Sequence, residues 1–339
     1  MASIRDVARR AGVSTSTVSR VISRKIPVDR RTGERVMRAI RELNYRPNLL
    51  ASGLRTRSAR SIGLLVPRIA DPFFMQMIDY VDRCVIDHGF NLLLFNTHSD
   101  PAFEEQVLDN LLRRHVDGII FSSVSDESRV PSLLIGVEAP IVMLDRVRDD
   151  AKLMHLVLNN RMAGELAAEH LLGLGHRRIA CVTGPRTLHL CADRLAGFSD
   201  CLARRGSPLE PDFTIEGDFS LDAGRSAGER LLAAPRRPTA VWAQNDLMAA
   251  GIVKAAISGG LRVPEDISVM GMDDAMIAEV VHPSLTTIAQ PLKEMSERAV
   301  EMILKTKANA VVDRRVILDP SLVARQSTGA APESRGGAE

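Results

Sequence analysis

The chain has 339 residues, enough for two or three domains, of which 45% are hydrophobic and 25% charged. Residues 1–60 hold 15 Lys and Arg against four Asp and Glu, a net charge of +11, whereas the remainder carries −9, which predicts a polyanionic partner for the first segment. No apolar run reaches the ~18 residues of a membrane span, and residues 1–6 lack the apolar core of a signal peptide, so we expect a cytoplasmic protein.

The first 43 residues predict three short helices, in which apolar residues recur every three or four positions. The first ends at Gly12, Ser14 caps the second, and the third spans about 30–43. Two helices joined by a short turn with glycine form a helix-turn-helix, whose second helix enters the DNA major groove. A helical interaction module with a solvated basic face is the alternative. The side chains expected to contact bases or phosphates begin the second helix: Thr15, Ser16 and Arg20.

Residues 44–60 differ from this pattern. Pro47 is placed to begin a short helix over 48–54, and residues 55–60 form a basic linker. A helix of about seven residues is only marginally stable alone. We therefore expect this segment to fold only when a partner holds it.

From residue 61 onward, apolar strand-like runs alternate with amphipathic stretches of helical length. The runs lie at 62–66, 92–95, 119–121, 141–144, 155–158, 179–182, 240–243, 267–270 and 286–288. This alternation predicts an α/β fold with parallel, doubly wound sheets in two lobes that divide near residue 160, and a ligand between the lobes. The tail from 326 has no periodicity and is predicted to be disordered.

Short motifs in a fixed order carry a resemblance across the chain up to about residue 328. Besides the helix-turn-helix they are NYRPN (44–48), SIGLLVP (61–67), DPFF (71–74), VDGII (116–120), GHRRIA (175–180), RLAGF (194–198), NDLMA (245–249), VPEDISV (263–269) and LTTI (285–288). Together they resemble the LacI/GalR family of bacterial transcription regulators. The resemblance implies a sequence-specific DNA-binding repressor that binds a near-palindromic operator as a homodimer. It also implies four parts: an all-α headpiece (1–46), a hinge helix and linker (47–60), a two-lobed effector-binding and dimerisation domain of periplasmic-binding-protein type (61–328), and a disordered tail (329–339).

In this family the short helix after the headpiece folds on DNA and inserts a leucine into the minor groove. Leu54 holds the matching position and Asn48 begins the helix, so the resemblance implies DNA contacts from both. Gly53 is a departure, because glycine costs about 1 kcal/mol of helix stability relative to alanine. We expect it to weaken folding of the hinge.

The resemblance also implies a sugar site between the lobes, in which aromatic rings stack on the sugar and polar groups bond its hydroxyls. Carried over position by position, its residues are Asp71, Phe73, Phe74, Asp145, Arg146, Arg194, Phe219, Asn245, Asp273 and Gln290. This set most resembles pentose sites of ribose type, although two arginines suit a sugar acid or sugar phosphate equally, and a purine is a further alternative. Each residue also has a structural interpretation. Asp71 can cap a helix, Phe73 can lie in a core, and the arginines can form surface ion pairs.

An enzyme and a secreted solute-binding protein are the alternative classes. No G-x-S-x-G, G-x-x-x-x-G-K-[ST] or H-E-x-x-H motif is present, and the eight histidines lack ligand spacing, so we expect no catalytic residue, cofactor or metal. The four cysteines form no C-x-x-C pair and are expected to be reduced, buried thiols: Cys84, Cys181, Cys191 and Cys201. A solute-binding protein explains the acidic body but not the basic first segment.

Overall fold

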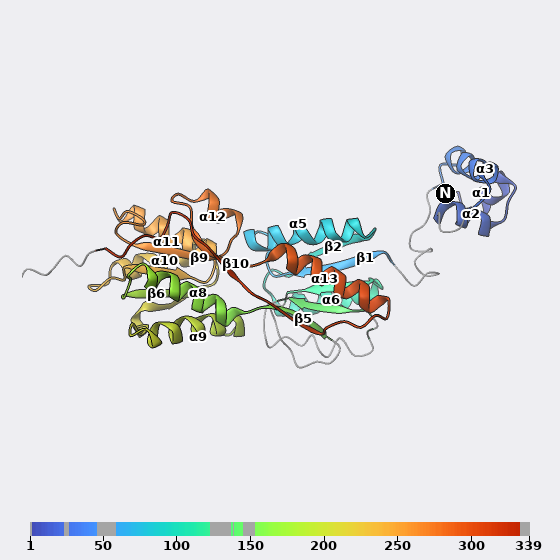
Figure 1. The fold of residues 1–339 in the computed structure, drawn as a ribbon. Coiled ribbons are helices and arrows are strands. Elements are labelled where there is room, and N and C mark those ends of the chain that lie inside the picture. The colour runs from blue at the N-terminus through green and yellow to red at the C-terminus, as the bar shows by residue number, and fades with distance from the viewer. Residues whose placement is uncertain are drawn as a thin grey trace, which may run out of the picture. The chain divides into compact units, whose positions relative to one another are not determined.

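The computed structural model describes residues 2–23, 27–45, 59–122, 137, 139–144 and 153–332. The chain divides into two compact units, residues 1–59 and 60–339, each of which is described by itself (Figure 1).

The described residues of the N-terminal unit form three helices, α1 (Ile4–Ala11), α2 (Thr15–Ser23) and α3 (Arg30–Glu42), which confirms the predicted helix-turn-helix. Ser3 and Asp6 form a capping box at the start of α1, and Gly12 ends this helix in the left-handed conformation at φ 61°. Small apolar side chains fill the core of the unit: Val7, Ala8, Ala11, Val18, Val36 and Ala39.

The first lobe of the larger unit is a parallel sheet with the strand order β11-β5-β4-β3-β1-β2. Its strands are β1 (Ser61–Val66), β2 (Asn91–Asn96), β3 (Gly118–Phe121), β4 (Ile141–Leu144), β5 (Leu153–Leu158) and β11 (Arg315–Leu318). Apolar side chains of α5 (Pro72–Asp87) and α13 (Leu292–Lys307) pack on one face, and those of α6 (Pro101–Arg113) pack on the other.

The second lobe has the strand order β12-β10-β9-β8-β6-β7, parallel except for β12, which is antiparallel to β10. Its strands are β6 (Ile179–Thr183), β7 (Thr214–Glu216), β8 (Ala240–Ala243), β9 (Ser268–Asp273), β10 (Thr286–Ala289) and β12 (Ser321–Val323). Helices α8 (Asn160–Gly173) and α9 (His189–Arg204) cover one face, and α10 (Leu221–Leu232) and α11 (Asp246–Ser258) cover the other (Figure 1). Two short elements complete the lobe, the 3₁₀-helix η1 (Pro211–Phe213) and helix α12 (Met276–Val280).

The chain passes between the lobes three times: after β5, between β10 and α13, and between β11 and β12. The two-lobed parallel fold is therefore as predicted, but a single division near residue 160 is not. Helix α13 and strand β11 return to the first lobe after the second has formed. The side chain of Asn159 in the first passage donates to Oδ1 of Asp319 in the third at 3.1 Å, which ties two passages together.

The prediction of a disordered tail is wrong for residues 326–332. Backbone groups of this segment bond to the second lobe: Ser327 O accepts from Val269 N, and Ala331 N donates to Leu174 O. His176, fully buried, also contacts the carbonyl of Gly329. These bonds pair the backbone polar groups, so the segment is held without apolar periodicity.

All four cysteines are free thiols, and Cys84 is half-buried rather than buried. In the part of the chain that the structure describes, no helix is both long and apolar enough to span a membrane.

Candidate functional site

The exposed face of α2 carries Thr15, Ser16 and Arg20, the three residues predicted to contact DNA that the structure describes. The Ser14 hydroxyl accepts from Thr17 N at 3.2 Å and so caps this helix as predicted. Asn48 and Leu54 lie outside the described residues.

Arg35 of α3 fixes the turn between α1 and α2. Its guanidinium donates to the carbonyl oxygens of Ala11 and Gly12, which would otherwise be open at the end of α1. Part of the positive charge in this unit therefore orients the second helix.

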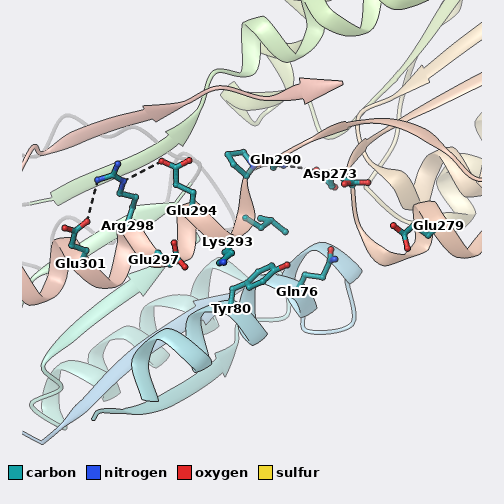
Figure 2. A pocket seen from close by; sticks show the side chains of 13 residues that line it. Gln76, Tyr80, Asp273, Glu279, Gln290, Lys293, Glu294, Glu297, Arg298 and Glu301 are labelled. Atoms are coloured by element: carbon teal, nitrogen blue, oxygen red, sulfur yellow. Dashed lines mark hydrogen bonds and ion pairs between the residues drawn. The ribbon is translucent and has the colours of Figure 1, made fainter. Parts of the chain in front are cut away.

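In the larger unit, a cavity of about 800 Å³ lies between the second lobe and helices α5 and α13. Figure 2 shows Asp273 and Gln290 at one end, and side chains of α13 and α5 along its length. Gln290 lies in the second passage between the lobes, and its Nε2 donates to Oδ1 of Asp273 at 2.7 Å. Both residues are buried, and the Oε1 atom of Gln290 has no hydrogen-bond partner within the described residues. This oxygen can accept a hydrogen bond from a ligand.

Arg194 of α9 is buried at 3% exposure, so its interpretation as a surface ion pair is wrong. Its Nε donates to Oδ1 of Asn160 at 2.8 Å, and its Nη1 donates to the carbonyl of Gln244 at 3.1 Å. Asn160 begins α8 directly after the first passage, and Gln244 follows β8. Two loops at the carboxyl ends of strands therefore hold the guanidinium in one orientation.

Asn245 and Phe219 are joined by a hydrogen bond. The Asn245 side chain caps α11 by accepting from Met248 N, and its Nδ2 donates to the carbonyl of Phe219 at 2.9 Å. Phe219 adopts φ 67°, and its ring lies against Gly184, where a Cβ atom would overlap it. The glycine thus leaves room for the ring that the sequence assigned to ligand stacking.

The described residues of the first lobe have structural roles as well. Asp71 caps α5 through its bond from Phe73 N at 2.9 Å, and burial raises the pKa of its carboxyl. Phe73 packs into the core of the first lobe at 6% exposure, and the half-buried Phe74 meets its ring edge-on at 5.0 Å between centroids. Asp145 and Arg146 lie outside the described residues.

Two buried carboxyl groups, those of Asp273 and Asp246, lie in this region. Burial raises the pKa of Asp273 well above its ordinary value, against the opposing effect of Arg194, and the negative charges of Asp246 and Asp71 raise it further. Burial also raises the pKa of Asp246 to about 7.

The cavity joins only part of the predicted set. Of the predicted residues that the structure describes, Asp273 and Gln290 line it, and the remaining lining residues include charged side chains of α13 such as Glu294, Glu297 and Arg298. The sequence did not identify four residues that hydrogen-bond to Arg194 or to the turn after Asp273: Asn160, Gln244, Asp246 and Thr287. The feature that could have identified them is a polar side chain within a predicted strand or shortly after its end.

The family description "Bacterial regulatory proteins, lacI family" matches residues 3–48, and "Periplasmic binding protein-like domain" matches residues 168–328. The ribose operon repressor of Escherichia coli K12 is 36% identical over 331 residues, covering 96% of this chain and all of the relative. The HTH-type transcriptional repressor PurR of Aliivibrio salmonicida is 35% identical over 329 residues, covering 96% of this chain and 99% of the relative.

Two solved structures are similar along nearly the whole chain. The lac repressor dimer bound to operator and the anti-inducer ONPF superposes with a TM-score of 0.86 at 31% identity, covering 97% of this chain and 99% of that one. The complex of the transcriptional regulator CelR with cellobiose gives a TM-score of 0.73 at 29% identity, covering 96% of this chain and all of that one.

Proposed function

Because the chain belongs to the LacI family of bacterial transcriptional regulators, which are not enzymes, we propose that it is a repressor whose operator affinity is controlled by a monosaccharide of pentose type. The repressor binds a near-palindromic operator in the cytoplasm as a homodimer, and the sugar binds between the lobes. The observation that carries the ligand class is the buried Gln290–Asp273 pair with its unpaired acceptor oxygen.

The chemistry of the described site favours a neutral polyol over an anion. Gln290 Oε1 and the carboxyl groups of Asp71 and Asp273 are acceptors, which sugar hydroxyls satisfy as donors. Arg194, held by Asn160 and Gln244, retains further N–H groups for a ring or hydroxyl oxygen. Apart from Asp273, the cavity lining holds more acidic than basic side chains, so a sugar acid or sugar phosphate is less favoured: Asp274, Glu279, Glu294, Glu297 and Glu301 stand against Lys293 and Arg298.

A purine remains the second candidate ligand, because the PurR relatives are as similar to this chain as the ribose repressor is. Phe74 and Phe219 supply aromatic rings that suit a flat base, and the same acceptors suit its N–H groups. The two ligand classes differ in what Asp273 recognises: adjacent hydroxyls or a ring N–H.

Dimerisation is supported by apolar side chains exposed on both lobes. Met276 and Val280 of α12 are 58% and 70% exposed, and Met75 and Ile86 of α5 are 47% and 57% exposed. Exposed apolar side chains on successive turns of a helix are typical of protein–protein contacts. Sedimentation of the full chain tests this proposal, and a monomer at micromolar concentration would contradict it.

Ligand class is tested by calorimetric titration and thermal unfolding of the full-length protein with D-ribose, D-ribose 5-phosphate, D-gluconate and hypoxanthine. A ligand present at 100 times its dissociation constant stabilises the folded state by about 2.7 kcal/mol. We expect D-ribose to stabilise the protein and D-ribose 5-phosphate and D-gluconate to bind at least tenfold more weakly. Tighter binding of either anion would contradict the proposed ligand class, and binding of hypoxanthine alone would favour the purine alternative.

Operator recognition is tested by selecting binding sequences from random duplex DNA and comparing Arg20→Ala with Arg30→Ala. Arg20 lies on α2, whereas Arg30 begins α3 and pairs with Glu34. Arg20→Ala should lower the preference for the operator over random DNA by about 1–3 kcal/mol, whereas Arg30→Ala should weaken both similarly. Equal losses in the two variants would remove Arg20 from the base-reading residues.

A further inference from the structure

Asp246, the first residue of α11, is 1% exposed and joins three segments that are distant in the sequence. Its Oδ2 accepts from Ala275 N at 2.8 Å, and its Oδ1 accepts from the Thr287 hydroxyl at 2.7 Å. Ala275 follows the carboxyl end of β9, and Thr287 is the second residue of the neighbouring strand β10. Asp246 is therefore placed directly behind the ligand end of the second lobe.

The segment held by Asp246 has an unfavourable backbone conformation. Asp273 adopts φ 112° and Asp274 adopts φ 56°, two consecutive non-glycine residues in the left-handed region. Such residues persist only where the surrounding structure holds them. The Thr287 hydroxyl accepts from Asp274 N at 3.4 Å while it donates to Asp246. The Asp246–Thr287 pair thus binds the amides of both residues that follow Asp273.

This turn has the ligand site on one side and an exposed surface on the other. Asp273 lines the cavity, and Ala275 is the N-cap of α12 but makes no side-chain capping bond. The Asp246 carboxyl instead accepts from the backbone amide of the N-cap residue itself, Ala275 N, and so holds the chain where α12 begins. Met276 and Val280, on the following helix, are largely exposed.

Gly271 of β9 is the feature that allows this arrangement. A Cβ atom at this position would overlap Oδ1 of Asp246. Its φ is not in the left-handed region, so the glycine serves close approach rather than backbone conformation.

We propose that Asp246 is the positioning residue of the effector site. It holds the strained turn of residues 273–275, so that Asp273 faces the ligand and Met276 and Val280 of α12 stay exposed. The inference rests on the proposed function for the ligand, but not for the turn itself. A ligand that moves Asp273 must then move the start of α12, because Asp273 and Ala275 belong to one turn, whose amides at Asp274 and Ala275 are held by the Asp246–Thr287 pair.

The charges around Asp246 determine how this turn responds to pH. Asp273 and Asp274 lie on the turn itself, Arg325 after β12 pairs with Asp274 and contacts Glu279 of α12, and Arg194 of α9 lies near Asp273. Burial raises the pKa of Asp246 to about 7, so opening the turn to water lowers that pKa and releases a proton. Opening therefore becomes easier as pH rises from 6 to 8.

The test is amide hydrogen exchange of the peptide covering residues 272–282 in the full-length protein at pH 6, 7 and 8, corrected for intrinsic exchange. Asp246→Asn is compared with Asp222→Asn, which removes an exposed carboxyl from the first turn of α10 in the same lobe. We expect Asp246→Asn to lower the protection at least tenfold and to reduce the change between pH 6 and pH 8 to less than half. Asp222→Asn should stay within twofold of the wild type.

Binding of D-ribose by the same variants is measured by calorimetry. We expect Asp246→Asn to weaken binding at least tenfold while Asp222→Asn leaves it unchanged. If the wild type does not bind D-ribose, the proposed ligand is wrong and the exchange measurement alone decides the role of Asp246. Loss of protection without loss of D-ribose affinity would overturn the link between the turn and the site.

A second pair of variants serves if Asp246→Asn does not fold. Thr287→Val removes the bridging hydroxyl at nearly constant volume, and Thr287→Ser keeps it. Protection and its pH dependence should be lost in Thr287→Val and restored in Thr287→Ser. Unchanged protection with an unchanged pH dependence in Asp246→Asn, or equal behaviour of the two Thr287 variants, would overturn the proposal.

Discussion

The two lobes share one strand order and both bury a carboxyl near the carboxyl ends of their strands, but the first lobe buries a further one, Asp117, at the amino end. In the second lobe, Asp246 and Asp273 lie at the carboxyl ends of the strands, beside the cavity. In the first lobe, the buried Asp117 precedes β3 at the amino end, where its carboxyl accepts from Ser61 N and pairs with Lys307 of α13. Ser61 begins β1, directly after the linker from the DNA-binding unit.

The difference shows that the same strand order can carry buried polar groups at different ends of the sheet, with different roles. Both sheets are parallel over most of their strands and both are covered on two faces, as the alternating pattern of the sequence requires. Polar groups at one end of the second lobe line the cavity. A polar group at the other end of the first lobe fixes the point where the chain enters from residue 60.

The strongest test of this comparison is Lys307→Ala, which leaves the Asp117 carboxyl buried without its cation. Removing one member of a buried pair typically costs 3–5 kcal/mol, and we expect about 3 kcal/mol here because Lys307 is one-third exposed. Urea unfolding measures the loss. Lys305→Ala, which removes an exposed cation paired with Glu301 on the same helix, should cost under about 0.5 kcal/mol. Equal losses would show that the buried pair has no special weight.

Gly271→Ala disturbs the buried Asp246 carboxyl of the second lobe. The added methyl group overlaps the Asp246 carboxyl, and overpacking of this kind costs about 1–3 kcal/mol. We expect loss of stability together with weaker effector binding, measured by urea unfolding and calorimetry. Gly173→Ala at the end of α8, where nothing lies within 4 Å of the new methyl group, is the matched control and should leave both unchanged.

The pH dependence of stability should distinguish the lobes less strongly. The pKa of Asp246 is raised to about 7 in the folded state, so its carboxyl binds a proton more tightly when folded, and its contribution to stability falls as pH rises from about 4 to 7. Relative to Asp246→Asn, the wild type should lose about 1 kcal/mol per pH unit between pH 5 and pH 7. Parallel stability curves for the two proteins would contradict this assignment.

The smallest expected effect concerns Phe73, which the sequence placed in the ligand site and the structure places in the first-lobe core. Phe73→Leu should cost about 1 kcal/mol of stability through lost packing and change effector affinity by less than threefold. Phe74→Leu, at the half-buried neighbour, is the comparison. A larger loss of affinity in Phe73→Leu than in Phe74→Leu would return Phe73 to the site.

The sequence predicted strands well where apolar runs are buried on both faces, as in β1 and β4. It missed three strands near the sheet edges: β11, which begins at Arg315 and has alternating burial, and β7 and β12, which are only three residues long.

The ligand site was predicted by resemblance more than by pattern. Arg194 and Gln290 were expected, but the groups that orient them come from loops distant in the sequence, so no local spacing reveals them. Asp246 was unremarkable because an acid in the first turn of a helix is common on any surface. Its importance depends on Thr287, which lies 41 residues away and approaches only in the folded sheet.

The three passages between the lobes have a consequence for synthesis on the ribosome. The DNA-binding unit and the first five strands of the first lobe are made early, but α13 and β11 are made only after nearly all of the second lobe. Until then Gly118, against which Ile303 of α13 packs, remains uncovered. At a synthesis rate of roughly 5–20 residues per second, a nascent chain carries a complete DNA-binding unit for roughly 10 seconds or more before α13 and β11 can complete the first lobe.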